Sequence, residues 1–301
     1  MDIWEGRISY ESTGTTILAL LSDLHIDAAD HDRELLIEDL ETAKKLGARI
    51  SINGDTIDGI LPSDRKRHHP SVGKHNPKRD DIMNQIVKQA VDVLSPYADY
   101  IDVISPGNHE RSILKYHHVD ITSMIVGMLN AVRSDDFPPI HVGSYRGFQV
   151  YRFRTKRGSG RTLTIFRHHG LGGSAPVTGG ALDLDRIRKD FDADLYWIGH
   201  KHQSIQRSFS RYSIGNGGML FERKQRAVMS AGYKSRLTPE EPDAFGDIAD
   251  YGEQFYNVSQ TGAQWVLIQY ITNNMCKSYT RGIRWSVMDS PYALLQTISD
   301  E

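Results

Sequence analysis

The first half of the chain alternates short apolar runs with segments in which apolar residues recur at helical spacing. The runs at 15–23, 48–55 and 100–108 have the length of buried strands, and each ends in polar residues. Between them, residues 33–47 carry leucines along one helix face, and residues 79–94 form a second helical segment. This alternation predicts a parallel sheet with helices on its faces.

The second half of the chain has a different pattern. Two apolar runs flank a glycine-rich turn, which is typical of a hairpin, and they lie at 147–154 and 161–170. We expect a second, mostly antiparallel sheet here, with helices outside both sheets. The pattern between 206 and 262 is too weak to assign elements. The remaining expected elements are a short helix at 183–193 and strands at 194–200, 264–271 and 283–289.

Length and composition set the expected domain organisation. A chain of 301 residues is near the size limit of one hydrophobic core. Hydrophobic residues make up 39% and charged residues 25%, as in an ordinary soluble protein. We expect one domain over 1–301, with a motif-bearing core at about 15–205 and C-terminal strands with an extension at 206–301.

Charge and cysteine usage exclude several classes of protein. The only cysteine, Cys276, excludes an internal disulfide framework and a thiolate metal cage. The net charge of −2 means that binding to nucleic acid would need a local basic surface. No apolar run approaches the ~18 residues that span a bilayer, and the polar N-terminus does not resemble a secretory signal. We therefore expect a cytoplasmic protein without a membrane partner. These features leave its oligomeric state open.

Side chains with metal-binding chemistry follow five of the expected strands at the point where each strand ends. The carboxyl ends of strands form the ligand crevice of open α/β sheets, so these side chains are expected at one rim. Imidazole nitrogen and carboxylate oxygen together suit Mn, Fe, Zn, Ni or Co. In chain order the residues are Asp23 and His25, Asp55 and Asp58, Asn108, His109 and Glu110, His168 and His169, and His200 and His202.

These candidate ligands are more numerous than one metal ion accepts. Two ions that share a carboxylate would use them, and such pairs lie about 3.5–4 Å apart with a phosphoryl group clamped between them. His200 and His202 would then each bind a different ion. Taken alone, each motif also has a structural explanation, such as a helix cap at Asp23. Their joint occurrence favours a site.

The motifs SDLHID, GDTID, GNHE, HHG and GHKH, in this order over residues 22–202, resemble those of the calcineurin-like metallophosphoesterase superfamily. The resemblance implies an α/β fold, a four-layer sandwich of two mixed β-sheets flanked by helices. It also implies two divalent metal ions, for which we expect Mn first, with Fe, Zn, Ni or Co as alternatives. The charged insert after GDTID and the glycine-rich HHGLGG look like phosphoesterases of phage and bacterial genomes.

The resemblance also implies which residues bind the two metals. His169 is favoured for the second metal because it precedes Gly170, and His168 stays an alternative. The implied ligands are Asp23, His25 and His202 for the first metal, Asn108, His169 and His200 for the second, and Asp55 as the bridge between them.

Two further residues receive catalytic roles from the resemblance. His109 would assist departure of the leaving group rather than bind metal. Asp58 would orient His109 and fix its tautomer, and Glu110 is the alternative partner.

These features together predict a dinuclear phosphoesterase in which a metal-bridging hydroxide attacks phosphorus. Basic segments at 62–80 and 152–161 favour phosphodiester substrates, with DNA, RNA and nucleotides as candidates, although solvated loops would have the same composition. One alternative is a phosphomonoesterase acting on nucleotides or phosphoproteins. Another is a non-catalytic scaffold, which the intact motifs disfavour. The candidate substrate contacts are Arg65, Lys66, Arg67, Arg111 and Lys201.

Overall fold

The computed structural model describes residues 1–10, 14–61, 81–155, 160–170, 172, 180–214, 217–234, 262–270 and 283–291. The basic segment 62–80, with Arg65, Lys66 and Arg67, lies outside the described residues. The strands are β1 (Asp2–Tyr10), β2 (Gly14–Leu21), β3 (Arg49–Asn53), β4 (Ile101–Ser105), β5 (His141–Val142), β6 (Arg146–Thr155), β7 (Gly160–His168), β8 (Leu195–Ile198), β9 (Ile205–Ile214), β10 (Leu220–Met229), β11 (Gln264–Tyr270) and β12 (Ile283–Met288). The helices are α1 (Arg33–Lys45), α2 (Ile82–Leu94), η1 (Ser95–Tyr100), α3 (Asn108–His117), α4 (Ile121–Val132) and α5 (Ala181–Ile187).

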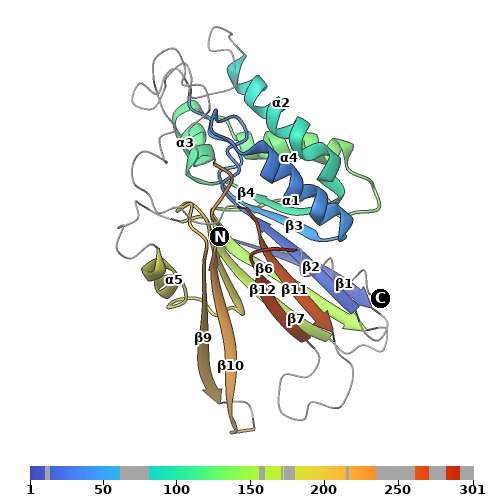
Figure 1. The fold of residues 1–301 in the computed structure, drawn as a ribbon, viewed down its shortest axis with the longest axis vertical. Coiled ribbons are helices and arrows are strands. Elements are labelled where there is room, and N and C mark those ends of the chain that lie inside the picture. Colours follow the sequence, from blue (N-terminus) through green and yellow to red (C-terminus); the bar gives the residue numbers. More distant parts are fainter. Residues whose placement is uncertain are drawn as a thin grey trace.

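The first sheet has the strand order β12-β11-β2-β3-β4-β5. Strands β2 to β5 pair in parallel, and β11 joins β2 and β12 in antiparallel pairs. Residues of α1, α2 and α4 share one apolar cluster with one face of this sheet, and Figure 1 shows these helices gathered on one side of the molecule. The expected parallel strands with packed helices are confirmed for β2 to β5, but the helices cover one face only, because the other face packs against the second sheet.

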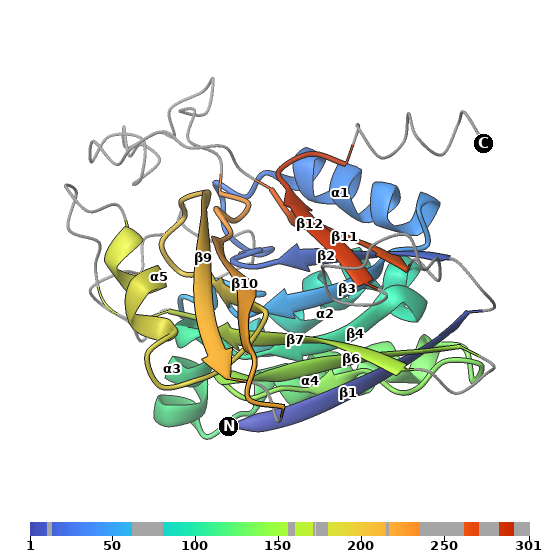
Figure 2. The same cartoon turned by 90° about the horizontal axis from the view of Figure 1, so that it is seen from below.

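The second sheet has the strand order β1-β6-β7-β8-β10-β9. A second apolar cluster, which includes Trp197, fills the space between the sheets. Figure 2 shows β11, β2 and β3 in one layer and β7, β6 and β1 in the other. On the outer face, Leu184 of α5 packs with Tyr196. The order helices, sheet, sheet, helix confirms the four-layer sandwich.

Alternating side chains explain why β2 is apolar without interruption. Successive residues of a strand point to opposite faces of its sheet. Ala19 and Leu21 accordingly join the cluster under the helices, whereas Leu18 and Leu20 join the cluster between the sheets. Both faces are buried, so the run 17–21 contains no polar position.

Three expectations about the second half are corrected. The second sheet is not mostly antiparallel, because β1 with β6, β7 with β8 and β8 with β10 pair in parallel. Strands β11 and β12 extend the first sheet instead of the second, because β11 occupies the free side of β2. The helix expected at 183–193 is shorter and ends at Ile187. Part of the unassigned stretch 206–262 forms the β9–β10 hairpin, which extends away from α1, α2, α3 and α4 in Figure 1.

The described helices include none that combines the length and apolarity needed to cross a lipid bilayer.

Candidate metal centre

The carboxyl ends of parallel strands from both sheets meet at one rim. In the first sheet these strands are β2, β3 and β4, and in the second they are β7, β8 and β10. Backbone hydrogen bonds continue past the strand ends. The Asp23 N–H donates to the Gly54 oxygen at 3.0 Å, and the Gly199 N–H donates to the His169 oxygen at 3.0 Å. The motif loops are thereby held against one another.

Five candidate ligands have a left-handed backbone conformation, which is uncommon for residues other than glycine. Their φ angles lie between +46° and +71°, and His118 is the only further non-glycine residue with positive φ among those described. Such conformations cost about 1–3 kcal/mol each and concentrate at functional sites. The five are Asp23, His25, Asp55, His200 and His202.

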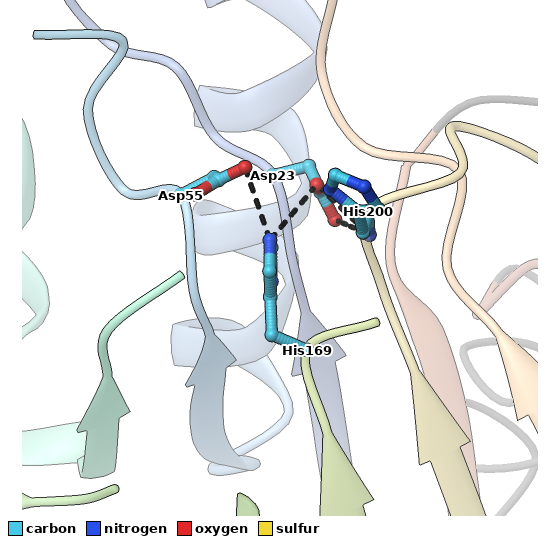
Figure 3. Close-up of side chains that lie close together, drawn as sticks. All are labelled: Asp23, Asp55, His169 and His200. Carbon is cyan, nitrogen blue, oxygen red and sulfur yellow. Dashed lines mark hydrogen bonds and ion pairs between the residues drawn. The ribbon is translucent and has the colours of Figure 1, made fainter. Parts of the chain in front are cut away.

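Asp23, Asp55, His169 and His200 each direct a potential ligand atom to the same point (Figure 3). These atoms lie within 4.8 Å of one another. Nε2 of His169 is 3.0 Å from Oδ2 of Asp55 and 4.0 Å from Oδ1 of Asp23. The amide oxygen of Asn108 is 3.0 Å from the same Nε2 atom. These side chains converge as the sequence predicted.

The structure distinguishes His169 from His168. Nδ1 of His169 lies 2.7 Å from the backbone oxygen of Asn53, so Nδ1 carries a proton and Nε2 is the nitrogen that faces the site. His168 instead accepts the Gly170 N–H on Nδ1 at 2.9 Å. Of these two histidines, only His169 belongs to a described cluster of potential metal ligands.

Two more clusters of potential ligands share residues with the first. Asp23, His25 and His202 form one, and His25, Asp55 and His109 form the other, with ligand atoms within 4.8 Å in each. Nε2 of His202 is 3.8 Å from Oδ1 of Asp23. The first set equals the implied ligands of the first metal.

Asp58 contacts two imidazoles through different atoms. Its carboxylate Oδ1 lies 2.9 Å from Nδ1 of His25 and 3.6 Å from Nδ1 of His109. Its backbone oxygen lies 2.5 Å from Nδ1 of His109. The main chain of Asp58 therefore orients His109, whereas its carboxylate orients His25. Sequence reasoning did not anticipate this division.

Glu110 was considered as a partner of His109, but its carboxylate binds backbone N–H groups instead. Its buried carboxylate accepts the backbone N–H of Gly107 at 2.8 Å and of Asp55 at 3.2 Å. It also accepts the N–H of Thr56 at 2.7 Å and of Ile57 at 3.3 Å. The Gly107 bond caps α3, and the other three tie its first turn to the loop that follows β3. Glu110 thus holds the backbone that presents Asp55.

Glycine is required where these two loops touch. Gly54 has φ +87°, and a Cβ atom there would collide with the His169 ring and the Gly107 backbone. A side chain at Gly107 would likewise collide with Asp55. The glycines of GDTID and GNHE therefore permit the close approach of their loops.

The electrostatics of the site favour a bound cation. Burial alone would raise the pKa of Asp55, but His169 and His109 outweigh it and hold this pKa well below its usual range. Burial acts to lower the pKa of His169, yet Asp55 and Asp23 raise it to about 10. Burial lowers the pKa of His200 and His202. The carboxylates hold a proton on His169 that a metal ion would displace.

The residues present fit divalent metal ions. Nε2 of His25 is buried and has no hydrogen-bond partner among the described residues, and it lies 4.0 Å from Oδ2 of Asp55. A metal between these atoms would satisfy both, because imidazole nitrogen and carboxylate oxygen are ligands for the same borderline cations. The clusters can therefore hold metal.

The segment after β10 contributes to the rim, and no sequence motif indicated it. The Tyr233 N–H donates to the Asp23 backbone oxygen at 3.0 Å. Nζ of Lys234 lies 3.4 Å from Oδ1 of Asp58 and 3.4 Å from Oδ1 of Asp30. Lys234 therefore offsets the charge of the carboxylate that orients His25.

Tyr145 is another rim residue without a sequence signal. Its hydroxyl donates to the Gly170 oxygen at 2.6 Å, and its ring packs edge-on against His169 with centroids 5.4 Å apart. The guanidinium of Arg111 lies over the same ring, 4.9 Å from its centroid. Arg111 is exposed beside the candidate ligands.

Lys201 and the basic hairpin 152–161 have surroundings that the sequence did not indicate. The Lys201 side chain is 3% exposed and ties the rim to α5, with Nζ 3.6 Å from Oδ2 of Asp183 and donating to the Gly172 oxygen. The basic hairpin 152–161 is at the far end of β6 and β7. Arg146 pairs with His168 next to the site, whereas Arg154 pairs with Gly160 eight positions further along, which is about 27 Å away. Residues 156–159 are outside the described residues.

One family model matches the chain. The family model of calcineurin-like phosphoesterases matches residues 17–204, and no curated protein matches the chain. Similar solved structures include the calcineurin-like phosphoesterase YfkN from Bacillus subtilis, at 12% identity and TM-score 0.37 over 96% of this chain and 98% of that one. GAP50, the anchor in the inner membrane complex of Plasmodium, has 11% identity and TM-score 0.38 over 91% and 84%. A metallophosphoesterase from Sphaerobacter thermophilus has 12% identity and TM-score 0.32 over 94% and 92%.

The family match spans more than half of the chain and contains every motif from SDLHID to GHKH. The chain belongs to the calcineurin-like phosphoesterase family.

Proposed function

We propose that this protein is a dinuclear metal-dependent phosphoesterase that hydrolyses phosphodiester bonds, with nucleic acids or nucleotides as substrates. The geometry around one carboxylate oxygen carries the proposal. Oδ2 of Asp55 lies 3.0 Å from Nε2 of His169, 4.0 Å from Nε2 of His25 and 3.9 Å from Nε2 of His109. An oxygen surrounded by imidazoles in this way suits a carboxylate shared by two metals.

The remaining ligands divide into two sets around Asp55. One set approaches from the side of His25 and the other from the side of His169, and each combines nitrogen and oxygen donors. The proposed ligands are Asp23, His25 and His202 for one metal and Asn108, His169 and His200 for the other. When bound, two such metals polarise phosphoryl oxygens and lower the pKa of coordinated water from 15.7 toward ~7.

His109 is placed to serve the leaving group. Its Nδ1 proton is held by the Asp58 backbone oxygen, so Nε2 is the nitrogen that faces the site. Its side chain is 14% exposed, so a substrate can reach it, whereas Asp55 is buried. A protonated His109 would pass its Nε2 proton to the departing oxygen and keep its orientation through Nδ1.

The preference for diesters has weaker support than the metal centre. The basic segment 62–80 directly follows Leu61, at the end of the loop that carries Asp55 and Asp58. Arg111 is exposed at the rim. The described residues of the hairpin 152–161 lie far from the site and do not support the preference. Manganese is proposed as the first metal to test. The same ligand set also accepts Fe, Zn, Ni and Co, so these metals are tested beside it.

A panel of phosphoesters assayed with each metal tests the proposal. Bis-nitrophenyl phosphate, nitrophenyl phosphate, cyclic nucleotides, and single-stranded and duplex nucleic acids are compared, with Asp55→Ala as the inactive control. We expect the diesters to be hydrolysed faster than the monoester. We also expect binding of nucleic acid to weaken steeply with salt.

Two outcomes would contradict different parts of the proposal. Faster hydrolysis of monoesters would replace the diester preference with phosphomonoesterase activity and leave the metal centre intact. Purified protein that binds no Mn and hydrolyses none of the substrates would instead support a non-catalytic scaffold.

A further inference from the structure

Asp27 is a buried carboxylate of the motif SDLHID to which none of the roles above applies. Its Oδ1 atom accepts the Asp58 N–H at 2.5 Å, and its Oδ2 atom accepts the Gly59 N–H at 2.9 Å. Among the described residues, neither of these N–H groups donates to a backbone oxygen. Burial and the Asp58 carboxylate raise the pKa of Asp27, whereas the two N–H donors act to lower it. Asp27 therefore holds the end of the loop that carries Asp55 and Asp58.

The Gly59 contact reaches His109 through one peptide group. The Gly59 N–H and the Asp58 carbonyl belong to the same planar unit, and in a trans peptide they point in opposite directions. The N–H points to Asp27, and the carbonyl oxygen lies 2.5 Å from Nδ1 of His109. A single rigid plane therefore connects the Asp27 carboxylate to the imidazole.

Two buried carboxylates hold different parts of this loop. Glu110 accepts the N–H groups of residues 55–57, which present the proposed bridging carboxylate. Asp27 accepts those of residues 58 and 59, which present the carbonyl oxygen to His109. The loop thus has one anchor beside the metal centre and another beside the imidazole.

Gly59 confines the same peptide group from a second side. Its φ angle is +60°, and a Cβ atom there would lie 2.6 Å from Cδ1 of Ile113. Ile113 is one turn beyond His109 on α3, so the peptide packs against the helix that carries the imidazole. A side chain at Gly59 would strain the backbone and push this peptide away from the helix.

We propose that Asp27 is a positioning residue for His109, which it orients through the peptide group between Asp58 and Gly59. This inference rests on the leaving-group role proposed above for His109. A fixed carbonyl oxygen keeps a proton on Nδ1 and directs Nε2 at the departing oxygen. Hydrogen bonds in a chain also strengthen one another, so the bond to Asp27 makes the Asp58 oxygen a better acceptor.

Asp27→Asn tests the proposal, because either orientation of the amide turns a donor toward one of the two N–H groups. The measurement compares kcat for alkyl and nitrophenyl esters, together with metal content and Tm. We expect a loss of about 10–100-fold on the alkyl ester and a change within about threefold on the nitrophenyl ester, with both metals retained. Asp120→Asn is the matched control, because Asp120 also accepts a backbone N–H, at the start of α4. It is expected to change neither rate.

A double-mutant cycle separates positioning from a purely structural role. If Asp27 acts through the imidazole, Asp27→Asn should cause no further loss on the alkyl ester in a His109→Ala background. Gly59→Ala displaces the same peptide without changing the carboxylate. It is therefore expected to lose activity selectively on the alkyl ester as well, which keeps the test informative if Asp27→Asn does not fold.

NMR gives a readout that does not depend on activity. With added Zn, which is diamagnetic, the Nδ1 proton of His109 is expected as a slowly exchanging signal that His109→Ala removes. Asp27→Asn should lose this signal through faster exchange with water, because the carbonyl oxygen is no longer held in place. Asp120→Asn should retain it.

Three results would overturn the proposal. One is an equal loss of activity on both esters in Asp27→Asn. Another is a further loss on the alkyl ester when Asp27→Asn is added to His109→Ala. The third is an unchanged Nδ1 signal of His109 in Asp27→Asn. A wild-type protein that hydrolyses no phosphoester would instead refute the proposed function, and the NMR comparison would still decide whether Asp27 orients His109.

Discussion

The carboxylate of Asp58 lies 2.9 Å from Nδ1 of His25, and it is the closest carboxylate to that nitrogen among the described ion pairs. A carboxylate at this position favours a proton on Nδ1 of His25, and Nε2 then faces Asp55. Lys234, 3.4 Å from the same carboxylate oxygen, keeps the buried charge of Asp58 compensated. The resemblance assigned Asp58 to orient His109, which serves the leaving group. In the structure, its carboxylate contacts His25, a proposed metal ligand.

Asp58→Asn is expected to weaken metal binding rather than leaving-group assistance. Loss of a carboxylate that orients a metal-binding histidine typically costs 10–100-fold in affinity. His109 keeps its orientation, because it contacts the Asp58 backbone oxygen. Chelator competition measures the affinity, and Asp190→Asn, at an exposed position, is the control. Unchanged affinity would exclude this role of the carboxylate.

His109→Ala is expected to retain both metals and to lose activity in proportion to the basicity of the leaving group. General acid assistance contributes about 10²–10⁴ in rate and matters little for a good leaving group such as nitrophenolate. The measurement compares kcat for nitrophenyl and alkyl esters, together with metal content. Equal losses on both substrates would show that His109 does not protonate the leaving oxygen.

Glu110→Gln is expected to destabilise the protein by about 2–4 kcal/mol, because the amide group turns a donor toward backbone N–H groups that need an acceptor. Either orientation of the amide leaves two of the four N–H groups without their acceptor. Denaturant unfolding measures the loss, with Glu34→Gln on the exposed face of α1 as the control. Similar stabilities of the two variants would contradict the role assigned to Glu110.

Asp39 is expected to make the stability of the protein depend on pH. Burial raises the pKa of Asp39 to about 6 from 3.8, although the Ala263 N–H and the Tyr233 hydroxyl both donate to it. The folded state therefore binds the proton more tightly than the unfolded state. The contribution of Asp39 to the free energy of unfolding should fall by about 3 kcal/mol as pH rises from about 4 to 6.

Unfolding of Asp39→Asn at several pH values isolates this contribution. The amide oxygen can still accept from Tyr233 and Ala263, and it carries no charge. The stability of the variant relative to the wild type should increase by about 3 kcal/mol between pH 4 and pH 7. A difference that does not change with pH would contradict the prediction.

The fold was largely predictable in segments where the spacing of apolar residues fits either a helix or a strand, but not both. The leucines of α1 and the apolar run of β2 identify a helix and a buried strand, and the structure confirms both. The partners of late strands were not predictable in the same way. An apolar strand such as β11 suits either sheet, and only the free side of β2 decides where it pairs.

The donor chemistry of the site follows from residue type, so the order of residues along the chain is enough to single out Asp23, Asp55 and His200. It is not enough to tell which of two adjacent histidines faces the site. Neighbouring residues of a strand point to opposite faces, but both faces of β7 near its end are buried, so no polar alternation marks them. His169 meets Asp55, whereas His168 turns away.

The sequence by itself determined the family, the ligand types and their positions after strands, because these depend on local order along the chain. Only the tertiary structure decided that Asp58 serves His25, that Lys201 joins α5 and that the basic hairpin lies far from the site. Such contacts depend on how segments distant in sequence pack, and short-range patterns contain no information about that packing.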